Sequence, residues 1–466
     1  MGFSDIILCI AFTTLAASYG WGMRGAVIGG EKGAMLPGAF IAVILAWFSG
    51  GEIRENLPAV AAAGLMGMSF GGIDTYGETI GLVLHRNMPD YKPVKGYTGL
   101  AVKGALWFSL GGGFVAFSVS AMSGAIYSAA DIVIFCLLIP LIQQIGFRIF
   151  NNPYNKEKGI RPMIYFSVKR REEWGSNFAL VIAMLILAAI KGDYLMLTMI
   201  SCGFVFGGIG WIVAMKAYEY SSFPMKNGKF LFTRLYRKGV FDGWKLMEFI
   251  LGAFGGFGIS LGFCIEHGVV AQHNKSILEN GRFSPLGNSE NVMIIVSTLL
   301  VSGILAINIY QFICEKKSKK LNWFLLDQLE RPLYNVIPTL FVLLGSSVVS
   351  RIMTVFMLVF VCVIKCVFDK FANERFIYVF QILSLAVCGV LFAGDIILGG
   401  YGPIVIMIAG TVPYLIAEFF CTVYDGRKKK LSLKNTFTKT AFATVYPCFA
   451  LMSAVILIVS CKIFLF

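Results

Sequence analysis

Apolar stretches and polar gaps alternate along the whole chain of 466 residues. A helix needs about 20 apolar residues to cross the hydrocarbon core of a bilayer. The fourteen stretches that we interpret as spans are residues 4–24, 34–50, 57–84, 99–123, 126–150, 177–191, 194–218, 244–265, 291–313, 333–350, 352–368, 376–399, 402–424 and 438–460. Three of these, 34–50, 177–191 and 352–368, are short. The pattern predicts an all-α, polytopic membrane helix bundle of about 12 to 14 transmembrane helices.

Lysine and arginine fall almost entirely in every second gap between the apolar stretches. These gaps and the helix ends that border them hold 33 of the 40 Lys and Arg residues. They are the loops 25–33, 85–98, 148–176, 216–245, 314–332, 365–375 and 425–439. Short basic loops stay on the cytoplasmic side of a membrane. We therefore expect a multi-pass protein of the cytoplasmic (inner or plasma) membrane with both termini extracytoplasmic.

The composition limits the chemistry that the chain can carry. The mean hydropathy is +0.75 and 14% of the residues are charged, whereas a soluble domain has about 25% charged residues. The net charge of +14 follows from the basic loops, so we expect the lipid bilayer as a partner and no nucleic acid. The longest polar connections are shorter than the about 40 residues that a small domain needs, which leaves the space between the helices for any functional site.

The residue types that hold metals and cofactors are sparse. The eleven cysteines are scattered and include no Cys-x-x-Cys pair, and there are three histidines. Buried cysteines of this kind behave as small hydrophobic residues. The sequence has no Gly-x-Ser-x-Gly, His-Glu-x-x-His or Walker motif. A Gly-x-Gly-x-x-Gly run occurs at residues 20–25, but it follows an apolar helix without the strand context of a dinucleotide site. We therefore predict no metal, no cofactor, no disulfide framework and no catalytic residues.

Glycines divide the chain and indicate a weak internal repeat. The motif Phe-Gly-Gly-Ile occurs at residues 70–73 and again at 206–209. Parallel repeats of this kind are common in transporters, although glycine-rich apolar helices also match by chance. The predicted domains are a glycine-rich transmembrane half with the candidate site, 1–265, and a six-helix scaffold half, 291–466.

Pairs of glycines four residues apart are expected to make flat grooves where two helices approach closely. These pairs are Gly67/Gly71, Gly203/Gly207, Gly252/Gly256 and Gly258/Gly262.

The segment 20–38 is the strongest candidate for a binding site. It contains seven glycines, one proline and three charges, and it is apolar between the charges. Such a composition is typical of a broken or re-entrant segment that lines a cavity, where glycine amides and basic side chains can hold an anion. The candidate substrate-binding residues are Arg24, Gly29, Gly30, Glu31, Lys32 and, from a later helix, Tyr76.

Carboxylates inside apolar stretches are the candidates for ion coupling, because ionisable groups in a membrane usually face a cavity or a partner. We expect Glu31, Asp74 and Glu78 in this role. The alternative is that Asp74 and Glu78 cap a helix end and that Arg24 and Lys32 only orient the chain.

Lys103 and Glu248 occupy adjacent positions in the two proposed repeats. We expect them to form a structural ion pair across the repeat interface.

These observations favour a secondary, ion-coupled transporter of a small solute, with an anionic group as the preferred feature of that solute. The alternative is an integral-membrane enzyme that acts on a lipid or a lipid-linked glycan. A third reading is a membrane assembly subunit without a substrate. The oligomeric state is not encoded in any of these patterns.

Overall fold

The computed structural model describes two long parts of the chain and a short third one. The described residues are 1–222, apart from 28–29, 75, 86–88, 154, 156, 161–163 and 168–171, then 243–287, isolated positions in 291–314, 336–356 and residue 432. Side chains are not described for residues 23–32 and a few other helical positions.

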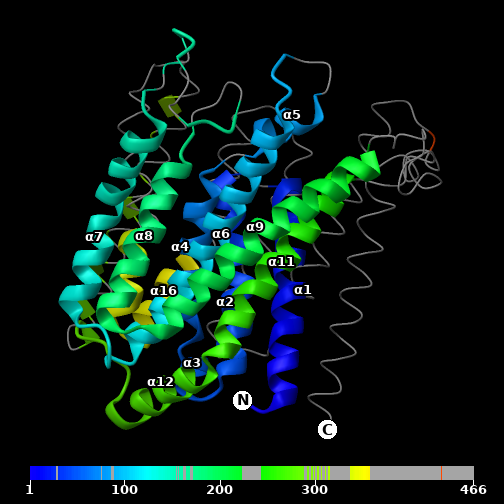
Figure 1. Ribbon diagram of the computed structural model, residues 1–466. Helices are drawn as coiled ribbons and strands as arrows, with labels where there is room; N and C mark the ends of the chain where they lie inside the picture. The colour runs from blue at the N-terminus through cyan, green and yellow to red at the C-terminus, as the bar shows by residue number, and fades with distance from the viewer. Residues whose placement is uncertain are drawn as a thin grey trace.

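The described residues form helices that pack into one bundle (Figure 1). The long helices are α1 (Phe3–Val27), α2 (Gly30–Ser49), α4 (Leu57–Gly72), α6 (Pro93–Met122), α7 (Ala129–Gly146), α8 (Trp174–Lys191), α9 (Tyr194–Ser222) and α11 (Gly243–Ile265). Shorter helices are α3 (Gly51–Glu55), α5 (Gly77–Leu84), α12 (His267–Asn280), α15 (Ile337–Leu344), α16 (Ser347–Phe356) and a π-helical turn at Phe147–Asn151.

The helix α6 lies at the centre of the bundle. It begins with Pro93, a residue that suits the first turn because its missing N–H has no partner there. Its 30 residues span about 45 Å, and its most apolar window is buried along its full length. The helices α4, α8, α9 and α11 pack around it, while α1 packs against α2 and α11. In Figure 1, α5 lies at the end of the bundle opposite the N-terminus, α3 and α12.

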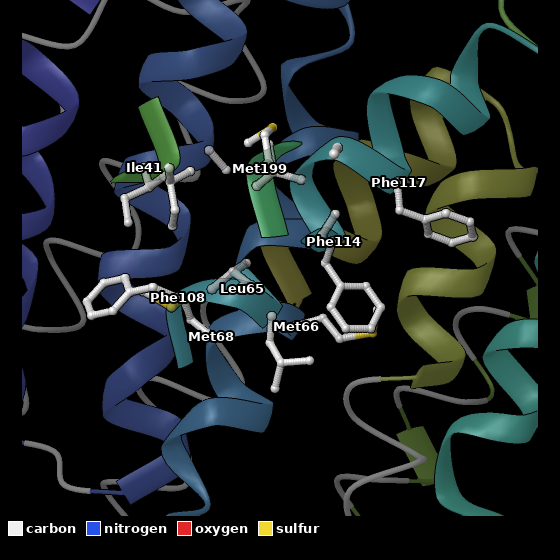
Figure 2. Packing of buried hydrophobic residues seen from close by; sticks show 14 of the residues in the cluster. Ile41, Leu65, Met66, Met68, Phe108, Phe114, Phe117 and Met199 are labelled. Atoms are coloured by element: carbon white, nitrogen blue, oxygen red, sulfur yellow. The ribbon is translucent and has the colours of Figure 1, made fainter. Parts of the chain in front are cut away.

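Buried aliphatic and aromatic side chains fill the space between α6 and its neighbours. Figure 2 shows this packing with Ile41, Leu65, Met66, Met68, Phe108, Phe114, Phe117 and Met199 labelled. They come from α2, α4, α6 and α9 and interlock without polar contacts of their own. Such packing, together with close backbone contact, holds helices together in lipid, where the hydrophobic effect between helices is weak.

Glycines allow the closest contacts, as the four-residue spacing predicts. A Cβ atom at Gly207 of α9 would collide with the carbonyl oxygen of Gly104 on α6. Gly38 on α2 and Gly64 on α4 approach each other in the same way. Each of the predicted glycine pairs faces a neighbouring helix, with α4 and α9 against α6 and with α11 against α1 and α9.

The outer helices expose apolar side chains. On α7, Ile134, Leu137 and Leu141 are 55–59% exposed, and Ile186 of α8 is 54% exposed. Six described helices are long and apolar enough to cross a membrane, or seven if the bent pair α4–α5 is one span. The prediction of an all-α polytopic membrane bundle is therefore confirmed.

The first eight expected spans each have a helical counterpart. Six correspond to the long apolar helices, 57–84 corresponds to the bent pair, and 34–50 corresponds to a shorter apolar helix at Gly33–Ser49. Most of the chain beyond residue 290 lies outside the described residues, so the total of 12 to 14 spans and the scaffold half 291–466 stay predictions.

The expected boundary between spans 333–350 and 352–368 is wrong. The helix breaks earlier, at Gly345 between α15 and α16, and α16 runs through residues 350–352. Arg282 holds this break, because its guanidinium donates to the Val342 carbonyl at 2.5 Å and to Ser350 Oγ at 2.7 Å. It also donates to Asn56 Oδ1 at 3.0 Å, which ties α15 and α16 to the beginning of α4.

Candidate functional site

The break between α4 and α5 positions the candidate site. α4 ends at Gly72, α5 begins at Gly77, and the two helices are bent by 47°. The amides of Ile73 and Asp74 bond back three residues, to Phe70 at 3.3 Å and Gly71 at 3.1 Å, so the last turn is tight. Glycine disfavours a continuous helix, and in a membrane the freed backbone is tolerated where it is buried in protein.

Five buried polar side chains gather here, from the break itself, α5, α6, α8 and the loop before α8. Asn177 of α8 donates to Asp74 Oδ2 at 2.8 Å. Lys103 of α6 donates to Thr79 Oγ1 at 2.9 Å, and its ammonium lies 3.5 Å from Glu172. Asp74 is within electrostatic reach of both Lys103 and Glu172. We call Asp74, Thr79, Lys103, Glu172 and Asn177 the buried polar cluster; each is at most 2% exposed.

Within the described part of the chain, the side chains of the buried polar cluster offer more acceptors than donors and more carboxylates than ammonium groups. It contains two carboxylates and one ammonium. Asp74 Oδ1, Asn177 Oδ1 and both Glu172 carboxylate oxygens are buried and accept no hydrogen bond in the described part of the protein. Buried acceptors without donors are costly, so this arrangement suits a bound proton, a small cation or ordered water that supplies the missing positive charge or donors.

A second set of contacts holds Tyr76 on the other side of the break. Tyr76 Oη and Trp244 Nε1 both donate to Glu248 Oε1 at 2.9 Å. Lys245 donates to Glu248 Oε2 at 2.6 Å and to the Gly22 carbonyl of α1 at 2.9 Å. Both carboxylate oxygens of Glu248 therefore have charged or polar donors, which makes this carboxylate a structural anchor between the break, α11 and α1.

Three tryptophan rings surround Tyr76. Its ring centroid lies 5.0 Å from Trp211, 5.7 Å from Trp107 and 5.6 Å from Trp244, with the last pair stacked. Aromatic pairs at such distances add to the stabilisation from burial. Tyr76 is thus held by its ring and by its hydroxyl, and the break has a defined position against α6, α9 and α11.

The expectation of a broken segment at 20–38 is wrong for most of its length. α1 continues as a helix to Val27 and α2 begins at Gly30. Gly20 and Gly38 serve close packing against Pro37 and Gly64. The sequence has no signal that separates glycines used for helix packing from glycines used for irregular backbone, and the break occurs at 73–76.

For the charged residues of segment 20–38, the structure describes the backbone but not the side chains. Arg24 lies in the last turn of α1, and Gly30, Glu31 and Lys32 begin α2. Gly29 and the side chains of the other four lie outside the described residues, so their predicted roles in binding and coupling stay predictions.

The expected Lys103–Glu248 ion pair is replaced by two separate sets of contacts. Lys103 lies against Glu172 at 3.5 Å, and Glu248 binds Lys245 at 2.6 Å. The repeat argument placed the two residues at one interface but could not foresee that each has a nearer partner.

Asp74 and Glu78 do not share one continuous helix, because the break separates them. Glu78 lies in the first turn of α5 and is partly exposed. An acidic residue is favourable in the first turn of a helix, which supports capping for Glu78. Asp74 is buried in the polar cluster.

Sequence reasoning missed Glu172 and Asn177. Glu172 and the adjacent Glu173 stand directly after three basic residues in a strongly basic loop, and Asn177 begins an apolar stretch. Because these residues differ from their surroundings, they could have been singled out as candidates from the sequence. Among the described residues, no group of three or more His, Cys, Asp or Glu side chains comes together as a metal site.

No protein-family model, curated protein or solved structure matches this chain. The functional argument therefore rests on the geometry of the site.

Proposed function

We propose that this multi-pass membrane protein is a secondary transporter of a small solute, driven by a proton or sodium gradient. The observation that carries the proposal is the buried polar cluster at the α4–α5 break, with two carboxylates, one ammonium and four oxygens that accept no hydrogen bond among the described residues. Broken helices in transporters commonly bind the coupling ion. A protein that needed only stability would gain little from burying this unbalanced set.

Asp74 is the residue that binds the coupling cation in this proposal. Its Oδ2 is held by Asn177, while its Oδ1 is available for a proton or Na⁺. Loading Asp74 removes the excess negative charge and stabilises the bent arrangement of α4 and α5. Release restores the charge and favours a different position of α5, which is short and lies at one end of the bundle (Figure 1).

The solute site in this proposal lies beside the same end of the bundle. Arg24 and the amides of Gly29 and Gly30 bind an anionic group, with Glu31, Lys32 and Tyr76 contributing to the site. Tyr76 links this region to the break through Glu248 and Lys245, since Lys245 also bonds the Gly22 carbonyl near the end of α1. Glu31 and Glu78 remain further candidates for coupling.

We place the protein in the cytoplasmic (inner or plasma) membrane with both termini outside. The support is the sequence pattern, because the basic loops follow α1, α5, α7 with its π-helical turn, and α9, and short basic loops face the cytoplasm. In this orientation the α4–α5 break and the buried polar cluster are nearer the cytoplasmic side.

The test is gradient-driven uptake into proteoliposomes. Vesicles with an imposed pH or Na⁺ gradient are offered a mixture of organic acids, amino acids and phosphate esters, and their contents are identified by mass spectrometry. We expect at least one solute to accumulate in the wild type. Asp74→Asn is expected to lose about tenfold or more of the accumulation, because a neutral amide cannot exchange the cation.

The matched control is Asp131→Asn, which removes a carboxylate that caps α7 at its N-terminus. Its accumulation should stay near the wild-type level. Equal accumulation in Asp74→Asn and wild type would contradict the coupling role. Chemical conversion of an added lipid or lipid-linked glycan, without any dependence on a gradient, would favour the enzyme alternative.

A further inference from the structure

The helices α1 and α11 lie against each other in an antiparallel register. Gly252 of α11 faces Ala17 and Trp21 of α1, and Gly256, one turn later, faces Thr13 and Ala17. A step toward the C-terminus of α11 is therefore a step toward the N-terminus of α1. The glycines make this contact close, because a Cβ at Gly252 would meet the Ala17 carbonyl oxygen at 2.5 Å.

The same register brings two cysteines together two turns further along. Cys264 in the last turn of α11 lies with its Sγ 4.0 Å from the Ile6 carbonyl of α1. Cys9 stands one turn after Ile6, on the face of α1 that presents Thr13 and Ala17 to α11, and its thiol lies within interaction range of the Cys264 thiol. Both residues are buried, at 0% and 4% exposure, and neither is in a disulfide.

We propose that Cys9 and Cys264 are a redox-active pair that forms a disulfide between α1 and α11. Helices in such close contact can meet the Cα separation of about 4.4–6.8 Å that a disulfide needs. The pair lies at the end of the bundle that holds the N-terminus and α12 (Figure 1). Our topology puts this end outside, where oxidising conditions allow disulfides to persist.

The oxidant is another disulfide, either a thiol–disulfide oxidoreductase or a small-molecule disulfide. The Cys264 thiolate attacks one sulfur of that disulfide, which breaks its S–S bond and forms a mixed disulfide. The Cys9 thiolate then attacks the Cys264 sulfur and releases the second thiol. In total the two protein thiols lose two electrons and two protons, and the oxidant becomes two thiols. Cys264 begins the reaction because it is nearer the helix end.

The experiment oxidises the full-length protein in nanodiscs with oxidised glutathione. Remaining thiols are then alkylated under denaturing conditions, and non-reducing peptide mass spectrometry identifies any cross-link. We expect a Cys9–Cys264 linked peptide that dithiothreitol removes, and a rise of several degrees in the apparent melting temperature. The linked peptide should be lost in Cys9→Ser and in Cys264→Ser, and kept in Cys202→Ser, which changes a cysteine of α9.

The proposal is overturned if Cys9 and Cys264 are both fully alkylated after oxidation of the folded protein. It is also overturned if the link forms only after unfolding. Folding of each serine variant is checked by its melting profile under reducing conditions, which should equal that of the reduced wild type. If both serine variants fail this check, the wild-type peptide analysis alone decides the outcome.

Discussion

Replacing Lys103 with methionine probes the charge balance of the buried polar cluster. The change keeps most of the side-chain length but removes the ammonium that donates to Thr79 at 2.9 Å and faces Glu172 at 3.5 Å. Two carboxylates would then remain in a region that is at most 2% exposed, without the one cation among the cluster's residues. Removing one partner of a buried ion pair costs about 3–5 kcal/mol, so Lys103→Met should lower the free energy of unfolding by that amount.

A double-mutant cycle separates the ion pair from other effects of the substitution. Glu172→Gln removes one of the two carboxylates, so the double variant Lys103→Met, Glu172→Gln should recover about 2 kcal/mol of the loss. The assay is unfolding in mixed micelles with increasing SDS, followed by tryptophan fluorescence. Trp107 lies one turn from Lys103 and contacts Tyr76, so its emission reports on the same region.

The control is the ion pair between Lys191 and Asp131, which has a short separation of 2.7 Å but is partly exposed at 29% and 23%. Exposed pairs contribute less than about 1 kcal/mol, so Lys191→Met should have a small effect. A loss below about 1 kcal/mol in Lys103→Met, or no recovery in the double variant, would refute the reasoning.

Three further changes test other parts of the bundle. Gly64→Ala should lower the free energy of unfolding by about 1–3 kcal/mol, because the added Cβ overpacks the contact with Gly38. Gly268→Ala should not, because no atom lies near its added Cβ. Equal effects of the two changes in SDS unfolding would contradict the close contact between Gly64 and Gly38. Arg282→Ala removes three hydrogen bonds and should lower the free energy of unfolding by about 2–3 kcal/mol. Lys275→Ala changes an exposed residue and should lower it by less than about 1 kcal/mol. Similar losses in the two variants would contradict the role of Arg282 in joining α15 and α16 to α4. Burial lowers the pKa of His273 to about 4, against about 6.5 in the unfolded chain. Because the unfolded state takes up a proton first as the pH falls, the free energy of unfolding should fall by up to about 3 kcal/mol between about pH 6.5 and 4. His273→Gln should remove this loss. The same pH profile in the variant and the wild type would contradict the role of His273.

The fold class could be predicted because a membrane-spanning helix is recognised by the length of its apolar stretch, which is local in sequence. Apolar length and the alternation of basic loops identified the first eight helical segments, including the short stretch 34–50. The bend within 57–84 falls at Asp74, where a charge interrupts the apolar stretch. The boundary near residue 350 was missed because Arg282, far away in sequence, donates hydrogen bonds to Val342 and Ser350 on the two sides of Gly345.

The candidate site was harder to predict, because it depends on which residues meet in space. Glycine density pointed to 20–38, yet the glycines of that segment whose contacts are described, Gly20, Gly22 and Gly38, pack against other helices. Lys103 and Glu248 were recognised as buried charges, but Glu172, the partner of Lys103, lies outside the proposed repeat. Lys245, the partner of Glu248, lies three residues before it on the same helix. Asn177 stands out as a polar residue at the beginning of an apolar stretch, but the sequence does not identify Asp74 as its partner.

The central claim is that Asp74 holds an exchangeable cation, and equilibrium cation binding to the purified protein tests it most directly. Binding of radioactive Na⁺ and proton release between about pH 5 and 9 are measured on the wild type, Asp74→Asn and Asp131→Asn. We predict one cation equivalent per chain, as Na⁺ or as a proton, that is absent in Asp74→Asn and retained in Asp131→Asn. Identical binding and proton release in the wild type and Asp74→Asn would contradict the account.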